Sequence, residues 1–234
     1  MKFMKHYWSK FKMLRQIIGV ENPVIVEIGA HYGEDSMRFL ETFENPTIYC
    51  FEPDPRNIKV FKKHINHPNI VLCEFALSNI NGSAEFFQSY DPGGQNNVPE
   101  KYDWISFQDY KIEKLSNSGS SSLKRGYKKT LQESVEVETR RFDTWCEDNN
   151  VDFVDFVWID VQGAERDVIL GMGDAIRSVK YIWMEYGEAL YEDYMDRSDT
   201  INFMRERMFE EVPQLSNTHF QGDILFINKG VAPQ

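Results

Sequence analysis

The stretch from Val24 to Gly33, V-I-V-E-I-G-A-H-Y-G, constrains the fold of this chain most strongly. Its first five residues are apolar apart from Glu27, and a run that is apolar on both faces is typical of a central strand in a parallel sheet. Gly29 and Gly33 favour a turn in which the backbone comes close to a ligand, and a helical pattern follows. A strand, a glycine-containing turn and a helix in this order open the nucleotide-binding part of a doubly wound α/β sheet.

The glycine spacing argues against a dinucleotide as the ligand. The fingerprint G-x-G-x-x-G needs its second glycine where this chain has His31, and a bulky side chain there obstructs a pyrophosphate at the helix start. The carboxylate of Glu27 suits a ligand with an ammonium group better than it suits a diphosphate. A nicotinamide-dependent oxidoreductase is therefore the weaker alternative, and an ordinary strand–turn–helix of any α/β protein is the other.

Composition narrows the class of protein. The chain has 234 residues, enough for one α/β domain that spans 1–234, and its net charge of -11 disfavours nucleic acid as a partner. Cys50, Cys73 and Cys146 have no C-x-x-C spacing, so they indicate neither a zinc site nor a disulfide framework and favour a reducing, cytoplasmic location. No apolar run is long enough to cross a bilayer.

The N-terminal residues 1–22 predict an amphipathic helix that packs on the edge of the domain. Its apolar stripe consists of Phe3, Tyr7, Phe11, Leu14 and Ile18. A helix lying on a membrane surface is the alternative, because the same stretch is basic.

A second strand from Thr47 to Phe51 ends at Glu52. This acidic residue comes about twenty residues after the glycine turn, where doubly wound sheets place the group that binds ribose hydroxyls. Asp54 and Pro55 then predict the start of a helix. Glu52 is therefore predicted to bind a nucleoside.

The next segment predicts two short strands, 69–75 and 84–87. The turn Asn79-Ile80-Asn81-Gly82 is expected to join them as a hairpin. Residues 88–134 have no regular pattern but carry several aromatic side chains, so we predict that they form a cap over the active site. Aromatic faces among polar groups would suit a sugar, and the basic side chains of Lys124 and Arg125 could meet an anionic acceptor.

The second half of the chain places ionisable residues at predicted strand ends. Asp160 follows a buried strand over 151–159, and Glu185 follows a strand over 181–184. His219 precedes the last strand of a closing pair, 212–215 and 223–227. Because open α/β sheets carry their chemistry at the carboxyl ends of strands, these three residues are the candidates for a general base. Asp160 and Glu185 could also hold a magnesium or manganese ion.

Five motifs occur in an order that resembles the FkbM family of S-adenosylmethionine-dependent methyltransferases. They are E-I-G-A-H-Y-G, Y-C-F-E-P-D-P, F-A-L-S-N-x-x-G-S-A-E-F-F, G-S-S-S-L and V-W-I-D-V-Q-G-A-E. The resemblance implies a Rossmann-like class I fold, with a mostly parallel seven-stranded sheet, an antiparallel C-terminal strand and helices on both faces. It also implies O-methylation of a hydroxyl on a sugar, a glycan or a similar polyol. A non-catalytic module that binds S-adenosylmethionine or a partner is the alternative.

The resemblance also assigns the site. The cofactor-binding residues would be Glu27, Gly29, Ala30, His31, Tyr32, Gly33, Ser36, Glu52, Pro53, Ala76, Leu77 and Asp160. The substrate-binding residues would be Ser121, Ser122, Arg125 and Gln162. The family usually has Glu where this chain has Gln162, which argues against a role that needs a charge at that position.

Overall fold

A computed structural model describes residues 2–96, 98–102, 104–126, 131–187, 191–213 and 221–231. Seven strands form one sheet in the order β3-β2-β1-β7-β8-β10-β9. In that order the strands are β3 (Ile70–Cys73), β2 (Thr47–Phe51), β1 (Val24–Ile28), β7 (Val154–Ile159), β8 (Val179–Gly187), β10 (Gln221–Asn228) and β9 (Phe209–Glu211). Six of the strands run in one direction and β10 runs in the opposite direction, which confirms the predicted sheet.

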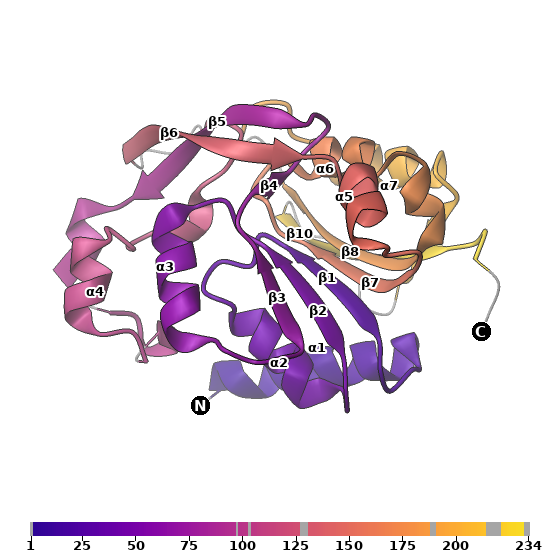
Figure 1. Ribbon diagram of the computed structural model, residues 1–234, viewed down its shortest axis with the longest axis horizontal. Coiled ribbons are helices and arrows are strands. Elements are labelled where there is room, and N and C mark those ends of the chain that lie inside the picture. Colours follow the sequence, from indigo (N-terminus) through magenta and orange to yellow (C-terminus); the bar gives the residue numbers. More distant parts are fainter. Residues whose placement is uncertain are drawn as a thin grey trace.

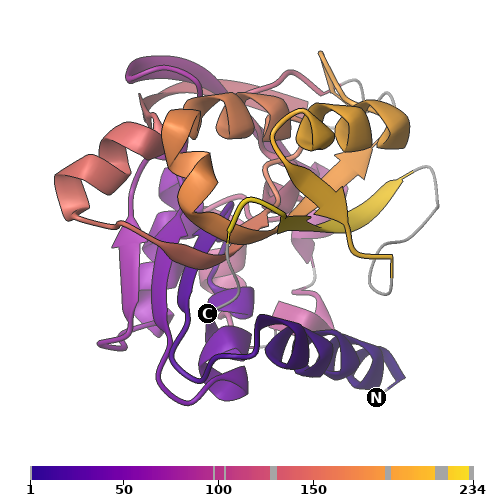
Figure 2. The same ribbon diagram turned by 90° about the vertical axis from the view of Figure 1, so that its right-hand side faces the viewer.

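Helices cover both faces of this sheet. One face carries α1 (Lys2–Ile18), α2 (Glu34–Thr42) and α3 (Pro55–His64), and the other carries α5 (Phe142–Asn149), α6 (Glu165–Gly171) and α7 (Arg197–Arg205) (Figures 1 and 2). A 3-10 segment, η4 (Gly173–Ser178), follows α6. No helix among the described residues has the length and apolar character needed to cross a membrane.

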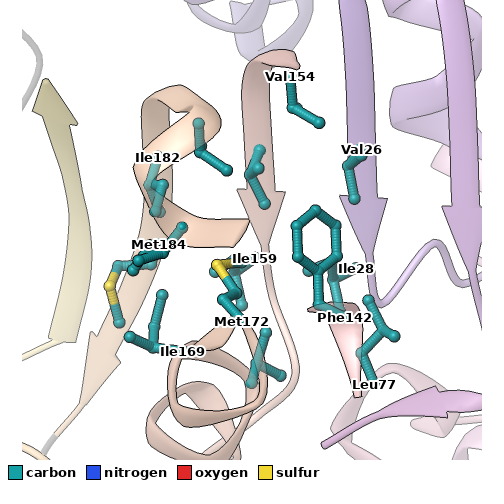
Figure 3. Packing of buried hydrophobic residues seen from close by; sticks show 14 of the residues in the cluster. Val26, Ile28, Leu77, Phe142, Val154, Ile159, Ile169, Met172, Ile182 and Met184 are labelled. Atoms are coloured by element: carbon teal, nitrogen blue, oxygen red, sulfur yellow. The ribbon is translucent and has the colours of Figure 1, made fainter. Parts of the chain in front are cut away.

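Two hydrophobic layers follow from the alternation of side chains along the central strands. Val26 and Ile28 of β1 pack with α5 and α6, together with Ile159 of β7 (Figure 3). Ile25 points to the opposite layer, where α1 and α2 lie. Strands buried on both faces therefore read as continuous apolar runs, which is why β1 and β2 were predicted with their observed bounds.

The N-terminal helix contributes to the second layer. Phe11, Leu14 and Ile18 are almost completely buried there, so this part of the predicted stripe is confirmed. The side chains of Phe3 and Tyr7 lie outside the described part of the structure.

A second sheet lies beyond the carboxyl ends of β1, β2 and β3 (Figure 1). It consists of β4 (Ala76–Leu77), β6 (Leu131–Arg140) and β5 (Gly82–Tyr90), in the order β4-β6-β5. The predicted hairpin between the strands at 69–75 and 84–87 is wrong, because β3 pairs with β2 in the main sheet, whereas β5 pairs with β6 in the small sheet. The long β6 pairs with β5 over nine positions, and this long-range pairing outweighs the local turn signal.

The chain between β5 and β6 contains short elements. These are η1 (Pro92–Asn96), η2 (Glu100–Tyr102), α4 (Phe107–Ile112) and η3 (Ser118–Ser120). They pack against the outer side of α3 through a cluster that includes Tyr110, Leu115 and Val60. The aromatic side chains in this segment thus belong partly to a small core, and its role as a cap stays a prediction.

The end of the chain differs from the prediction in its bounds. The helix α7 ends at Arg205, and the chain then turns at Met208, whose φ is 67°. The strand expected over 212–215 is instead β9, which ends at Glu211. A tight turn after α7 brings β9 into the sheet earlier than its apolar residues suggested.

Candidate active site

A cavity with about 540 Å³ of empty space lies between the carboxyl edge of the main sheet and the small sheet. We call it the nucleoside pocket. It is lined by Ile28, Gly29, His31, Phe51, Glu52, Pro53, Asn57, Ala76, Leu77, Phe86, Ser118, Gly119, Ser121, Leu123, Asp160, Val161, Gln162 and Ala164. Gly29, His31, Gly119 and Asp160 also border a wider hollow lined by Glu27, Ala30, Asp35 and Trp158. The predicted site residues at the ends of β1, β2 and β7 therefore meet in one place.

Gly29 allows the two central strands to end close together. Its φ is +89°, and a Cβ atom there would lie 1.9 Å from the carbonyl oxygen of Asp160. Its backbone N–H donates to the carbonyl of Phe51 at 2.9 Å. A residue with a side chain would therefore push β1 away from β7 and close the entrance to the pocket.

Glu52 is held rigidly at the end of β2. Its Oε2 accepts a hydrogen bond from the backbone N–H of His31 at 2.8 Å, and its Oε1 accepts from the backbone N–H of Asp54 at 2.9 Å. The Nδ2 of Asn57 donates to the same Oε1 at 3.2 Å. Burial, with the nearby Asp54 carboxylate, raises the pKa of Glu52 to about 7 despite these donors.

Glu27 lies at the wall of the wider hollow and is 2% exposed. The hydroxyl of Ser36 donates to its carboxylate, and the thiol of Cys50 lies 3.7 Å from the same oxygen. Burial raises the pKa of Glu27 well above its usual range, and Asp35 adds to this effect. Ser36 thus acts on the site through Glu27, because it does not itself line the pocket.

The two residues after Ala30 point in different directions. The ring of His31 borders the pocket, with Nδ1 3.1 Å from Glu34 and Nε2 3.0 Å from the hydroxyl of Ser118. Burial opposes protonation of His31, but the Glu34 carboxylate outweighs it and raises the pKa of His31. Tyr32 is fully buried and its hydroxyl lies 2.7 Å from that of Ser118, so its side chain anchors the segment between β5 and β6.

Gly33 does not line the nucleoside pocket or the wider hollow. Its φ is +85°, and a Cβ atom there would meet the side chains of Ile65 and Phe61. Its small size therefore serves the packing of α2 against α3. Both glycines were predicted to bind the cofactor, and of the two only Gly29 lines the pocket.

The side chain of Gln162 bridges the carboxylates of Asp160 and Glu185, and two further side chains hold this bridge in place. The Nε2 of Gln162 donates to Asp160 at 2.6 Å and to Glu185 at 2.9 Å. The hydroxyl of Tyr191 donates to the Oε1 of Gln162 at 3.0 Å, and the Nε2 of Gln221 donates to Glu185 at 2.6 Å. The predicted neighbours Asp160 and Glu185 are thus joined through an amide that is itself held in one orientation.

Burial raises the pKa values of both carboxyl groups. The Asp160 side chain is exposed at the pocket, and the protein atoms packed around it raise its pKa together with the charges of Asp223 and Asp35. Burial also raises the pKa of Glu185, and the adjacent Asp160 charge raises it further. Glu165 supports the loop that follows Asp160 by accepting from the backbone N–H groups of Val161 and Gly163.

The predicted cation finds no support here. Within the described ranges, no group of three or more His, Cys, Asp and Glu side chains has a geometry for a metal ion. An N–H donor of Gln162 lies between Asp160 and Glu185, in the place that a bridging cation would take. His219 lies outside the described residues.

The residues predicted for substrate binding lie in different surroundings. Gln162 and Ser121 line the nucleoside pocket, but the Ser121 hydroxyl already accepts from the backbone of Ser89 at 3.0 Å. Ser122 is 1% exposed and its hydroxyl donates to the carbonyl of Val161, so it supports the loop after β7. Arg125 is exposed and stacks on Phe87, away from the pocket.

Sequence reasoning missed several lining residues. Phe86 and Leu123 belong to quoted motifs, and their apolar character could have marked them as pocket walls. Asn57 lies in the first turn of α3, where a short polar residue normally suggests a helix cap. No sequence pattern marked Tyr191 as a residue of the site, because its position depends on the path of the chain after β8.

The pocket fits S-adenosylmethionine, the cofactor that the motifs imply. Ala76, Leu77 and Phe86 form an apolar wall suited to adenine, and Glu52 offers an acceptor to ribose hydroxyls. Gly29 lets the backbone of β1 approach that of Asp160 at the pocket wall, and Glu27 faces the hollow with a carboxylate suited to an ammonium group.

Comparisons with known proteins agree with this geometry. Residues 27–211 match the family model described as the methyltransferase FkbM domain. The chain is 30% identical over 237 residues to the 2-O-methyltransferase NoeI of Sinorhizobium fredii (strain NBRC 101917 / NGR234), and the alignment covers 94% of this chain and 86% of that protein.

Two solved structures give a likeness of shape. A Galdieria sulphuraria protein assigned provisionally as a sarcosine dimethylglycine methyltransferase aligns with a TM-score of 0.50 at 10% identity, covering 96% of this chain and 86% of that one. Magnesium protoporphyrin IX methyltransferase from Synechocystis PCC 6803, solved with bound S-adenosylmethionine, has a TM-score of 0.47 at 6% identity, covering 95% and 80%. The first likeness shows the fold alone.

Proposed function

Since this chain belongs to the FkbM family and is an S-adenosylmethionine-dependent methyltransferase, we propose that it methylates a hydroxyl of a saccharide or a similar polyol. The observation that carries the proposal is the bridge of Asp160, Gln162 and Glu185 at the mouth of the nucleoside pocket. The name of the relative, a 2-O-methyltransferase, supports oxygen as the acceptor atom. Membership in a methyltransferase family leaves the oxidoreductase and the non-catalytic module without support.

A second cavity offers a place for the acceptor. It lies beside the nucleoside pocket, and Gln162 lines both. Its other walls include Glu185, Tyr191, Tyr194 and Gln221. Aromatic faces together with carboxylate and amide groups match a sugar ring, which has apolar C–H faces and a rim of hydroxyls.

Methyl transfer to a hydroxyl requires two contributions from the protein, alignment of the acceptor oxygen and removal of its proton. S-adenosylmethionine supplies an electrophilic methyl group on a positively charged sulfur. The protein must hold the acceptor oxygen in line with that methyl and take up the hydroxyl proton as the oxygen attacks. Asp160 borders the nucleoside pocket, and Gln162 links it to Glu185 in the wall of the second cavity, which supports a role for Asp160 between the two reactants.

We assign Asp160 as the general base and Glu185 as its partner. The amide of Gln162 holds the two carboxyl groups close together, so the charge of one opposes ionisation of the other. Burial and the Asp160 charge raise the pKa of Glu185 to about 9, so Glu185 holds a proton at neutral pH beside Asp160. A carboxylate whose pKa is raised by burial is a stronger base than an exposed one, and this suits a weakly acidic sugar hydroxyl.

The three cysteines are unpaired thiols, two of them buried, which is consistent with our proposal of a reducing, cytoplasmic location.

The test is transfer of a labelled methyl group from S-adenosylmethionine to a panel of acceptors. The panel contains monosaccharides and oligosaccharides, matched deoxy-sugars that lack one hydroxyl each, and amines of similar size. We expect label on the sugars and its loss with one particular deoxy-sugar. Transfer to the amines alone would contradict O-methylation, and transfer to all deoxy-sugars equally would contradict a defined acceptor hydroxyl.

A further inference from the structure

Asn57 carries a polar atom with no partner at the wall of the nucleoside pocket. It lies in the first turn of α3 and is 3% exposed. Among the described residues, its Oδ1 is one of three buried side-chain nitrogen or oxygen atoms without a hydrogen bond. Of the three residues concerned, Asn57 alone lines the nucleoside pocket. A buried acceptor without a donor is unfavourable, so its position needs an explanation.

The carboxamide of Asn57 has a fixed orientation. Its Nδ2 donates to the Oε1 of Glu52 at 3.2 Å. A flipped amide would set its oxygen against the carboxylate oxygen, which would replace a hydrogen bond with a repulsion. The unpartnered Oδ1 is therefore the atom that remains available to a ligand in the pocket.

Glu52 by itself has too few free positions for two hydroxyls. Each carboxylate oxygen accepts about two hydrogen bonds. The Oε1 already accepts from Asp54 and from Asn57, and the Oε2 accepts from His31. One position remains on Oε2, whereas the cis-diol of a ribose brings two O–H donors on adjacent carbons.

We propose that Asn57 and Glu52 form a two-acceptor site for the ribose cis-diol, in which the Asn57 Oδ1 accepts from one hydroxyl and the Glu52 Oε2 accepts from the other. Asn57 is then a specificity-determining residue that selects a ribonucleoside over a deoxynucleoside. The inference rests on S-adenosylmethionine as the cofactor and is independent of the acceptor proposed above.

The test is calorimetric titration with S-adenosylhomocysteine and with its 2′-deoxy and 3′-deoxy analogues. For the unmodified protein we expect each analogue to bind roughly tenfold more weakly than S-adenosylhomocysteine, because each lacks one hydrogen bond to a buried acceptor. In Asn57→Leu, one analogue should bind as well as S-adenosylhomocysteine does, and the other should keep its tenfold defect. A purely structural role of Asn57 would weaken all three ligands by the same factor.

Asn149→Leu is the matched control. Asn149 lies in α5, is exposed, and donates to the carbonyl of Trp145, so the substitution should leave all three affinities unchanged. If Asn57→Leu does not fold, the unmodified protein alone decides the question. Equal binding of all three ligands would overturn the two-acceptor site while leaving the cofactor assignment intact. No binding of S-adenosylhomocysteine would overturn both.

Discussion

The nucleoside pocket and the acceptor side of the site are built by different means. The nucleoside pocket is shaped by backbone turns and apolar side chains, and its carboxylate Glu52 is held by three donors. The acceptor side is a network of side chains from separate segments, in which Gln162 joins Asp160 to Glu185 and Tyr191 holds Gln162. We therefore expect the nucleoside pocket to be sensitive to substitutions that alter the backbone. We expect the acceptor side to be sensitive to substitutions that alter the charge of a side chain.

Asp160→Asn should separate the roles of the two regions most clearly, because it should change catalysis without changing cofactor binding. If Asp160 takes up the hydroxyl proton, its loss should lower kcat by roughly 10²- to 10⁴-fold, while the affinity for S-adenosylhomocysteine changes little. Initial rates and calorimetry on the same preparation would separate the two effects. Asp167→Asn, which alters a carboxylate paired with Lys124 outside the pocket, is the control, and a full rate in Asp160→Asn would remove Asp160 as the base.

Glu52→Ala should give the reverse pattern. The loss of a buried acceptor for a ribose hydroxyl should weaken S-adenosylhomocysteine binding by about 1–3 kcal/mol. At saturating cofactor, kcat should fall far less than it does in Asp160→Asn. Glu85→Gln, on the exposed side of β5, serves as the control, and unchanged affinity in Glu52→Ala would show that Glu52 does not bind the nucleoside.

We expect the pH dependence of kcat to arise from ionisable groups on the acceptor side of the site. Burial raises the pKa of Asp160, and the base must be ionised, so kcat should fall as the pH is lowered through this raised pKa. Asp223 raises the pKa values of both Asp160 and Glu185 through its charge. Asp223→Asn should therefore move the inflection of a kcat–pH profile down by on the order of half a pH unit. A shift upward would contradict this electrostatic account.

We expect the smallest effect on the kcat–pH profile from a substitution in α1. The Nζ of Lys10 lies 3.3 Å from Asp223 and about 4 Å from the ring centroids of Trp158 and Trp183. Its positive charge favours the ionised form of Asp160, so Lys10→Met should move the same inflection up by a few tenths of a pH unit. Because Lys10→Met and Asp223→Asn act in opposite directions, the double variant should titrate close to the unmodified protein.

Several local features were predictable because their causes are local. The apolar run before Gly29 defined β1, and the acidic residue after Phe51 marked the pocket end of β2. Asp54 caps α3 by accepting from the backbone N–H of Arg56, as the sequence Asp-Pro indicated. The order of the motifs identified the family before any contact was known.

Other features failed where a distant segment decided the outcome. The turn over 79–82 suggested a hairpin, but β5 pairs with β6, about fifty residues later, and β3 pairs with β2 in the other sheet. Tyr32 was assigned to the cofactor, yet a buried contact with Ser118 turns its side chain toward the segment between β5 and β6. Neither partner is near in sequence, so no local pattern could reveal it.

The sequence by itself determined the order of the strands along the chain, the glycine that lets β1 approach β7, and the acidic residues at strand ends. These depend on the period of the backbone and on the size of single side chains, which act over a few residues. Only the tertiary structure decided that Gln162 joins two carboxylates, and that Asn57 keeps an acceptor free beside Glu52. Hydrogen bonds and pKa values in a buried site depend on which segments the fold brings within about 3 Å, and that choice is made by the packing of the whole domain.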